Sequence, residues 1–166
     1  MAGLTAVGAL LHLPVPYVPF TLQPVFVCLA GAWLGARLGA VSQVVYVAAG
    51  LVGFPVFVGG GGVHYLLEPT FGYLLGFPLA AWTVGTLADQ ATSYRRHLVA
   101  VEAGLTVLYL TGVPWLYLNL RYLAGQPLSP VATLALGLAP WPKDLLLGLG
   151  VAWLACRVQR LRRTAG

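Results

Sequence analysis

Charged residues are scarce in this chain, and they fall between long apolar runs. Asp, Glu, Lys and Arg make up 8% of its 166 residues, hydrophobic residues make up 59%, and the mean hydropathy is +0.85. A water-soluble domain of this length needs a polar shell that this composition cannot supply. The sequence therefore predicts an all-α, polytopic membrane protein with the bilayer as its solvent.

The chain contains six apolar runs, and a transmembrane helix needs about 20 apolar residues. We therefore predict one domain over residues 1–166 with six transmembrane helices. Residues 1–13 lack a basic n-region, so we interpret them as the first helix rather than as a signal peptide. Clustered prolines or glycines interrupt helices and predict the longer loops. The predicted helices cover residues 1–13, 21–38, 41–58, 69–88, 98–120 and 144–156, and the predicted loops cover 14–19, 59–68 and 121–142.

The basic residues orient these helices. Six crossings place both termini on one side, and a cytoplasmic location puts seven basic residues inside and two outside, as the positive-inside rule requires. The proline-rich and glycine-rich loops then lie outside, which favours an outward-facing site. The inner residues are Arg37, Arg95, Arg96, Arg157, Arg160, Arg162 and Arg163, and the outer ones are Arg121 and Lys143.

Small residues recur every four positions in three of the runs, which lets helix backbones approach closely in lipid. For the glycines we expect packing between helices of this chain. For the alanines of the first run, either packing within this chain or docking on a partner helix fits the pattern. These residues are Gly31, Gly35 and Gly39, Gly72 and Gly76, and Ala2 and Ala6.

Catalytic motifs are absent from the sequence. Lys143, the one lysine, lies between Pro142 and Asp144, so there is no Gly-Lys-Ser/Thr of a phosphate-binding P-loop. The histidines are scattered, the serines lack a triad context, and the two cysteines are interpreted as buried thiols. We therefore expect no enzyme activity, no metal and no cofactor. The net charge of +5 is interpreted as membrane orientation, with no nucleic-acid partner.

Polar and aromatic side chains gather at the predicted outer ends of the helices. The helix dipole and the aromatic belt of membrane proteins each explain some of them. Together, aromatic walls and a few convergent polar groups also describe a small-molecule pocket. The polar residues are Thr21, Gln23, Glu68, Thr70 and Asp144, and the aromatic ones are Tyr17, Phe20, Tyr65, Tyr73, Trp115 and Trp141.

Four segments carry a resemblance to a known family. Residues 16–23, Pro-Tyr-Val-Pro-Phe-Thr-Leu-Gln, resemble the Val-Pro-x-Thr-Leu-Gln motif of BioY proteins, the biotin-capturing S components of energy-coupling-factor (ECF) transporters. Residues 50–57 resemble that family's Gly-x-x-Gly-x-Pro-Val-Phe, and residues 68–77 its Gly-Pro-Thr-Gly-Gly-Tyr-Leu-x-Gly-Phe. Residues 142–144, Pro-Lys-Asp, resemble the start of its Pro-Gly-Asp-x-x-Lys. The matches run in order, so the chain is identified as a member of this family.

The resemblance implies a multi-pass protein of a prokaryotic plasma membrane, with a biotin site beneath the outer loops. Ala2 and Ala6 match a family face that docks on a transmembrane coupling subunit, which two ATPase subunits drive. Biotin would enter from outside, and Asp144 would accept hydrogen bonds from its ureido N–H groups. The predicted substrate-binding residues are Asp144, Lys143, Gln23, Tyr17, Thr70, Tyr73, Glu68, His64, Arg121 and Trp141.

The chain departs from the family pattern at three positions. Glu68 and Phe71 replace glycines, and Leu147 replaces the lysine of Asp-x-x-Lys. Lys143, Arg121, His64 or backbone amides are then the groups available to the ligand's carboxylate. Two alternatives stay open: the same architecture with another small vitamin or a precursor such as dethiobiotin, and an intramembrane enzyme acting on lipid.

Overall fold

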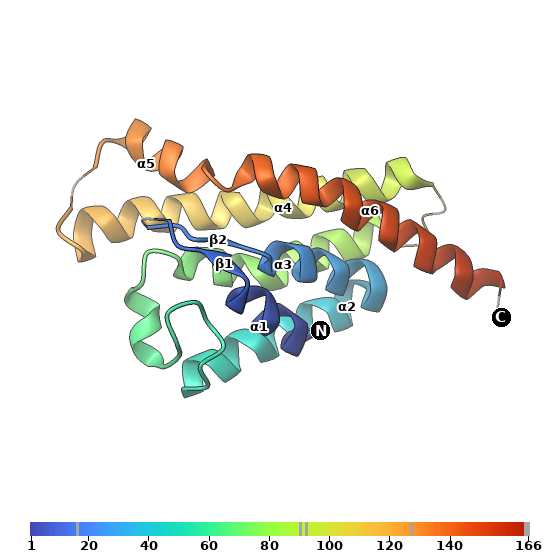
Figure 1. The fold of residues 1–166 in the computed structure, drawn as a ribbon, viewed down its shortest axis with the longest axis horizontal. Coiled ribbons are helices and arrows are strands. Elements are labelled where there is room, and N and C mark those ends of the chain that lie inside the picture. Colours follow the sequence, from blue (N-terminus) through green and yellow to red (C-terminus); the bar gives the residue numbers. More distant parts are fainter. Residues whose placement is uncertain (16, 90, 92, 127, 165–166) are drawn as a thin grey trace.

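Helices account for most of the computed structural model, which describes residues 1–15, 17–89, 91, 93–126 and 128–164, with side chains up to residue 161. In Figure 1, α4 runs the length of the molecule beside α5 and α6, with α3, α2 and α1 on its other side. Pro16, Pro127 and the side chains of Arg162 and Arg163 lie outside the described part. The elements are α1 (Ala2–Leu10), β1 (His12–Leu13), β2 (Phe20–Thr21), α2 (Gln23–Val52), the 3₁₀-helix η1 (Val63–Leu67), α3 (Phe71–Leu87), α4 (Tyr94–Leu118), the π-helix η2 (Asn119–Leu123), α5 (Pro130–Leu138) and α6 (Trp141–Thr164).

Helix α2 is a hairpin of two helical arms rather than one continuous rod. Gly35 has φ 78° and ψ 175°, a backbone conformation that residues with a Cβ atom rarely adopt. The chain reverses direction at this residue. A Cβ built on Gly39 would lie 2.9 Å from the carbonyl oxygen of Ala30, so the arms touch along their small residues. The two predicted runs are therefore separate arms, although the break falls at Gly35 rather than at residues 39–40. The second arm ends at Val52 rather than at the predicted residue 58, because Gly53 adopts a left-handed conformation with φ 118°.

Glycines hold α2, α3 and α4 close together. A Cβ on Gly31 would lie 2.2 Å from the carbonyl oxygen of Ala81, and one on Gly76 would lie 2.2 Å from Oγ1 of Thr111. Any side chain at these positions would push the helices apart. The prediction that the glycine series packs helices of this chain together is confirmed for Gly31, Gly39, Gly72 and Gly76, whereas Gly35 makes the reversal.

The predictions for residues 1–22 and 121–142 are partly wrong. The first helix ends at Leu10, and residues 12–13 pair with residues 20–21 in a short antiparallel hairpin. Helix α5 lies inside the segment that was predicted to be a loop. It begins there because Oγ of Ser129 accepts a hydrogen bond of 3.2 Å from the amide N–H of Ala132, and because Pro130 suits the first position of a helix. Helix α6 begins at Trp141, before Asp144, and continues to residue 164.

Among the described residues, three stretches are long and apolar enough to cross a membrane: 23–52, 94–123 and 130–161, with the shorter apolar helix Phe71–Leu87 beside them. The first stretch includes the Gly35 reversal. At about 1.5 Å per residue, its arms extend about 18 Å and about 26 Å. The number of crossings is therefore not fixed by helix length alone.

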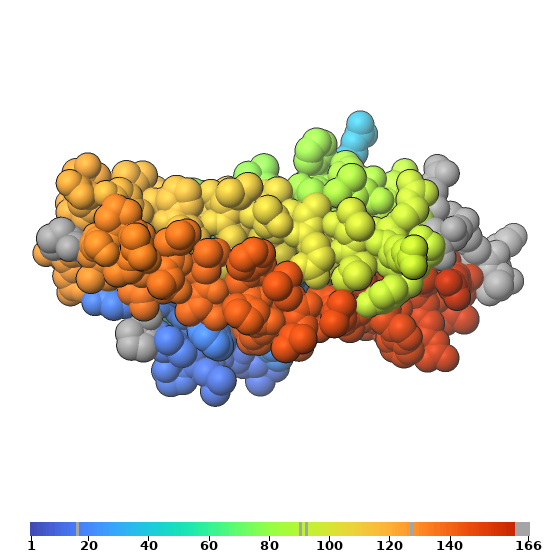
Figure 2. Space-filling view, turned by 90° about the horizontal axis from the view of Figure 1, so that it is seen from above, coloured from blue at the N-terminus to red at the C-terminus, as the bar shows by residue number. Residues whose placement is uncertain are grey.

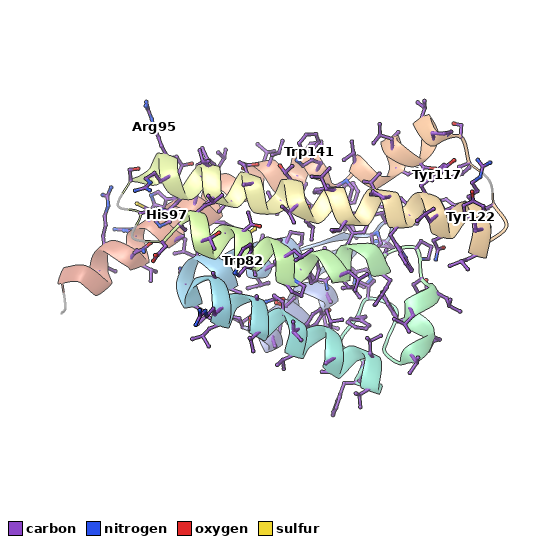
Figure 3. All side chains as sticks on the ribbon, turned by 180° about the vertical axis from the view of Figure 1, so that it is seen from behind. Trp82, Arg95, His97, Tyr117, Tyr122 and Trp141 are labelled. Atoms are coloured by element: carbon purple, nitrogen blue, oxygen red, sulfur yellow. The ribbon has the colours of Figure 1, made fainter. Side chains whose placement is uncertain are left out.

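The two ends of the bundle differ in charge. Gly35, Asp89 and Gln159 line one cavity of about 320 Å³, so the α2 reversal, the end of α3 and the C-terminal part of α6 meet at one end. Nε2 of His97, near the start of α4, lies 2.6 Å from Oε1 of Gln159 on α6. Figure 3 places Arg95 and His97 at this end of α4, and Tyr117 and Tyr122 at the other. We call the first the basic end, because Arg95 and Arg96 begin α4, Arg157 and Arg160 belong to the C-terminal part of α6, and Arg37 follows the reversal at Gly35.

Candidate functional site

A buried carboxylate at the start of α6 is the centre of the site. Asp144 is 3% exposed, and its amide donates to the carbonyl of Pro140 at 3.1 Å in the first turn of the helix. Its Oδ2 accepts a hydrogen bond of 2.5 Å from the hydroxyl of Tyr109 on α4. Its Oδ1 accepts one from Nζ of Lys143. Two neighbours therefore fix the carboxylate, and each oxygen keeps acceptor capacity for a ligand N–H.

Lys143 joins the carboxylate to the N-terminal hairpin. Its Nζ donates to the carbonyl oxygen of Thr21 at 2.6 Å, across 122 positions of sequence. The side chain of Lys143 is 25% exposed and that of Asp144 is 2% exposed, so the ion pair runs from the molecule's surface into its interior. The ammonium ties β2 to the first turn of α6.

A cavity of about 50 Å³ opens beside Asp144 and is walled mainly by aromatic and aliphatic side chains. Helices α2, α3, α4 and α6, the hairpin and the segment before α3 all contribute. Of the described residues that line it, Lys143 and Asp144 carry charge. The lining residues are Val18, Pro19, Thr21, Gln23, Pro24, Phe57, Val58, Tyr65, Thr70, Tyr73, Leu74, Phe77, Leu108, Tyr109, Pro140, Lys143 and Asp144.

A second polar chain anchors one wall of the cavity. Nε2 of Gln23, which is 5% exposed, donates to the hydroxyl of Tyr46 at 2.7 Å. That hydroxyl donates to the carbonyl oxygen of Val56 at 2.9 Å. The contact fixes the start of α2 against the segment that carries Phe57, and the ring of Phe57 lies 4.5 Å from that of Tyr65.

Tyr73 forms another part of the cavity wall, and a glycine makes room for it. Its hydroxyl donates to the carbonyl oxygen of Gly137 at 2.8 Å, and its ring meets that of Tyr109 edge to face at 5.7 Å. A Cβ on Gly112 would lie 2.3 Å from Cδ1 of Tyr73. The close approach of α3 and α4 at this point therefore depends on Gly112.

The structure brings part of the predicted binding set together. Asp144, Lys143, Gln23, Thr70 and Tyr73 line the cavity. Trp141 and Tyr17 are not among the residues that line it. The Trp141 ring packs against that of Tyr109, with ring centres 6.3 Å apart, and the Tyr17 hydroxyl donates to Oε1 of Gln126 at 2.7 Å. His64, Glu68 and Arg121 are exposed and do not line the cavity, and the Arg121 guanidinium lies over the rings of Tyr117 and Tyr122.

Tyr109 and Tyr46 belong to the site but were not predicted from the sequence. Each lies within a long apolar run, where its aromatic ring resembles any other core residue. The available signal was the phenolic hydroxyl, which needs a partner when a tyrosine is buried in a helix. Among the described residues, no group of three His, Cys, Asp or Glu side chains could hold a metal ion.

Ala2 and Ala6 lie on a partly buried edge of α1. Both contact the core cluster of this chain, and the neighbouring Thr5 is fully buried and donates to Oε1 of Gln43 at 3.2 Å. Leu4 and Val7, on the outer face, are 44% and 46% exposed. The alanines therefore make some contacts within the chain while part of their surface stays accessible.

Comparison with known proteins agrees with the family resemblance of the sequence motifs. The model of the BioY family matches residues 1–164. The chain belongs to the BioY family. The resemblance stated from the motifs is thereby confirmed, and it covers nearly the whole chain.

Individual members of the BioY family align closely with the chain. A probable biotin transporter BioY of Lysinibacillus sphaericus is 46% identical over 99% of this chain and 85% of its own length. The biotin transporter BioY of Thermotoga maritima is 42% identical over 67% of this chain and 66% of its own length. The crystal structure of the S component for biotin from an ECF-type ABC transporter superposes with a TM-score of 0.83, over 96% of this chain and 86% of that one, at 22% identity. The chain therefore has the S-component fold.

Proposed function

We propose that this BioY-family protein captures biotin from the outer side of the membrane and delivers it for import. Asp144 carries the proposal, because it is a buried carboxylate in an aromatic cavity whose two oxygens are held in place by Tyr109 and Lys143. A cyclic urea offers N–H donors that a fixed carboxylate accepts, and its fused rings suit aromatic walls. The names of the relatives support the same ligand.

The cavity must widen before it can hold biotin. Its volume of about 50 Å³ is room for a few water molecules rather than for a fused ring system with a side chain. Four of the residues that line it lie between the long helices: Val18 and Pro19 in the N-terminal hairpin, Phe57 after α2, and Tyr65 in the short 3₁₀-helix η1. We infer that the loops at 14–19 and 59–68 open to admit the ligand and then close over it.

The distribution of charge supports six crossings with both termini in the cytoplasm. The two arms of α2 count as separate helices because of the reversal at Gly35. Arg121 lies over Tyr117 and Tyr122, which Figure 3 places at the end of α4 opposite the basic end, and Lys143 donates to Thr21 in the N-terminal hairpin. This arrangement matches the positive-inside rule and supports an outward-facing cavity.

Import requires energy that this chain does not supply, because its sequence lacks a P-loop lysine. The S-component fold supports assembly with an ECF module of one transmembrane coupling subunit and two ATPase subunits. Ala2 and Ala6, which keep part of their surface accessible, are the proposed contact with the coupling subunit.

Mass spectrometry of the small molecule that co-purifies with the detergent-solubilised protein, followed by calorimetry with biotin, tests the proposed ligand. We expect biotin in the purified protein and tight binding after its removal. As a member of a transporter family, the chain is not an enzyme, which leaves another small vitamin or a biotin precursor as the alternative. Bound dethiobiotin, or absence of binding to biotin, would overturn the assignment.

A further inference from the structure

A groove of about 170 Å³ lies at the basic end, away from the cavity that holds Asp144. Its lining consists of Tyr94, Trp153, Cys156, Arg157 and Arg160, none of which lines that cavity. In Figure 2 the start of α4, in lime, lies beside the C-terminal half of α6, in red. The groove is the space between these two helices.

One side of the groove continues into an apolar surface that runs along α6. Leu146, Leu149 and Trp153 are 71%, 45% and 54% exposed and follow one another at spacings of three and four residues, which places them on one face of the helix. The hydroxyl of Tyr94 lies 3.4 Å from the carbonyl oxygen of Leu149, so α4 borders this face. In a membrane, such a face meets acyl chains.

The other side of the groove presents guanidinium groups. The guanidinium carbon of Arg157 lies 5.0 Å from the centre of the Trp153 ring, a cation–π contact that orients the group at the junction of the apolar and charged surfaces. Arg160 follows three residues later on the same side of α6 and lines the same groove. In the described part of the chain, the charged residues that line the groove are Arg157 and Arg160. Guanidinium groups bind phosphate oxygens through two parallel hydrogen bonds.

We propose that this groove is a binding site for one anionic glycerophospholipid. Its phosphate contacts Arg157 and Arg160, and its acyl chains lie along Leu149 and Trp153. Orientation of the chain in the membrane requires basic residues at this end. Orientation alone does not require two arginines beside a groove that continues into an apolar helix face. This combination of charged and apolar surface matches a lipid with a negatively charged headgroup.

Native mass spectrometry of the full chain in detergent, titrated with phosphatidylglycerol or phosphatidylcholine, tests the site. We expect phosphatidylglycerol to bind at least about fivefold more tightly, and Arg157→Gln to weaken it by about fivefold, as one basic residue near an anionic headgroup does. Arg95→Gln is the matched control, because it removes the same charge at the same end from an exposed side chain that points away from the bundle in Figure 3. Its effect should stay below about twofold.

Three results would overturn the lipid site. The first is equal binding of the two lipids by the unaltered chain, which needs no variant. The second is an equal loss for Arg157→Gln and Arg95→Gln, which would indicate diffuse attraction to the basic end. The third is displacement of phosphatidylglycerol by millimolar inorganic phosphate, which would indicate a site for small anions. None of these outcomes depends on biotin binding.

Discussion

The hydroxyl of Tyr109 on α4 donates to Oδ2 of Asp144 on α6 across 2.5 Å. Lys143 meets the other oxygen from the neighbouring position, so the carboxylate is held from two helices before any ligand arrives. A preorganised acceptor loses less entropy when it binds a ligand than one that must first be ordered. Ligand binding should therefore depend most strongly on this carboxylate.

Replacement of Asp144 with Ala should weaken biotin binding by about 30-fold or more. A hydrogen bond to a charged group contributes about 1.5–3 kcal/mol, and its loss leaves both the ligand N–H groups and the Tyr109 hydroxyl without their acceptor. Isothermal titration calorimetry measures the effect. An unchanged affinity would remove Asp144 from the binding site and leave it a role in stabilising the start of α6.

Lys143→Met should weaken biotin binding by about tenfold. The variant loses the charge-assisted hydrogen bond from Lys143 to the Thr21 carbonyl, and it also loses the ammonium group that pairs with Asp144. Arg121→Gln is the matched control, since Arg121 is also a predicted outer cation but lies outside the cavity. It should change the affinity by less than about twofold. The reverse order of effects would assign the ligand's carboxylate to Arg121.

Gly112→Ala should destabilise the protein and impair binding. The added methyl would lie 2.3 Å from Cδ1 of Tyr73, and overpacking of this kind costs about 1–3 kcal/mol. Gly3→Ala is the control, because a Cβ at Gly3 meets nothing within 4 Å. Thermal unfolding in detergent should show a lower midpoint for the first variant only. Equal midpoints would mean that the Tyr73 wall adjusts without cost.

Cysteine accessibility tests the orientation in the membrane. Gly61 is a poor labelling position, because a side chain there would collide with the carbonyl oxygen of Phe54 at 2.0 Å. Val63, which is 67% exposed in the same outer segment, is better, and Leu161, 64% exposed near the basic end, is its inner counterpart. An impermeant thiol reagent added to intact cells should label Val63→Cys but not Leu161→Cys. The opposite pattern would invert the topology and the proposed direction of capture.

Ala6→Trp tests the role of α1. If this edge docks on the coupling subunit, the variant should keep its biotin affinity but lose co-purification with the ATPase module, because a bulky side chain prevents close approach of helices. Val7→Trp, on the exposed face, should still assemble. Loss of biotin binding together with assembly would show that Ala6 serves packing within the chain, to which its contacts with the core already contribute. Normal assembly of the Ala6 variant would rule out docking at this edge.

Composition and local spacing were sufficient for the class of protein and for much of its helical organisation. Apolar runs, helix-breaking glycines and prolines and the position of arginines are properties of short segments, so they can be read without knowing which segments become neighbours. Gly31 and Gly76 were predicted as contact points because small residues at four-residue spacing have the same meaning wherever the partner helix lies. Asp144 was recognised because its motif is continuous in sequence.

Only the tertiary structure decided how the cavity is built. The Gly35 reversal returns α2 along itself, and the packing of α4 against α6 directs Tyr109 at Asp144. The packing of α6 against the N-terminal part of the chain places Lys143 against the Thr21 carbonyl, and Arg121, on η2, lies outside the cavity. A local pattern specifies which face of a helix is apolar, but the side chain opposite it depends on the register and crossing of helices that are distant in sequence. These depend on the fit of many side chains at once, and no single segment carries that information.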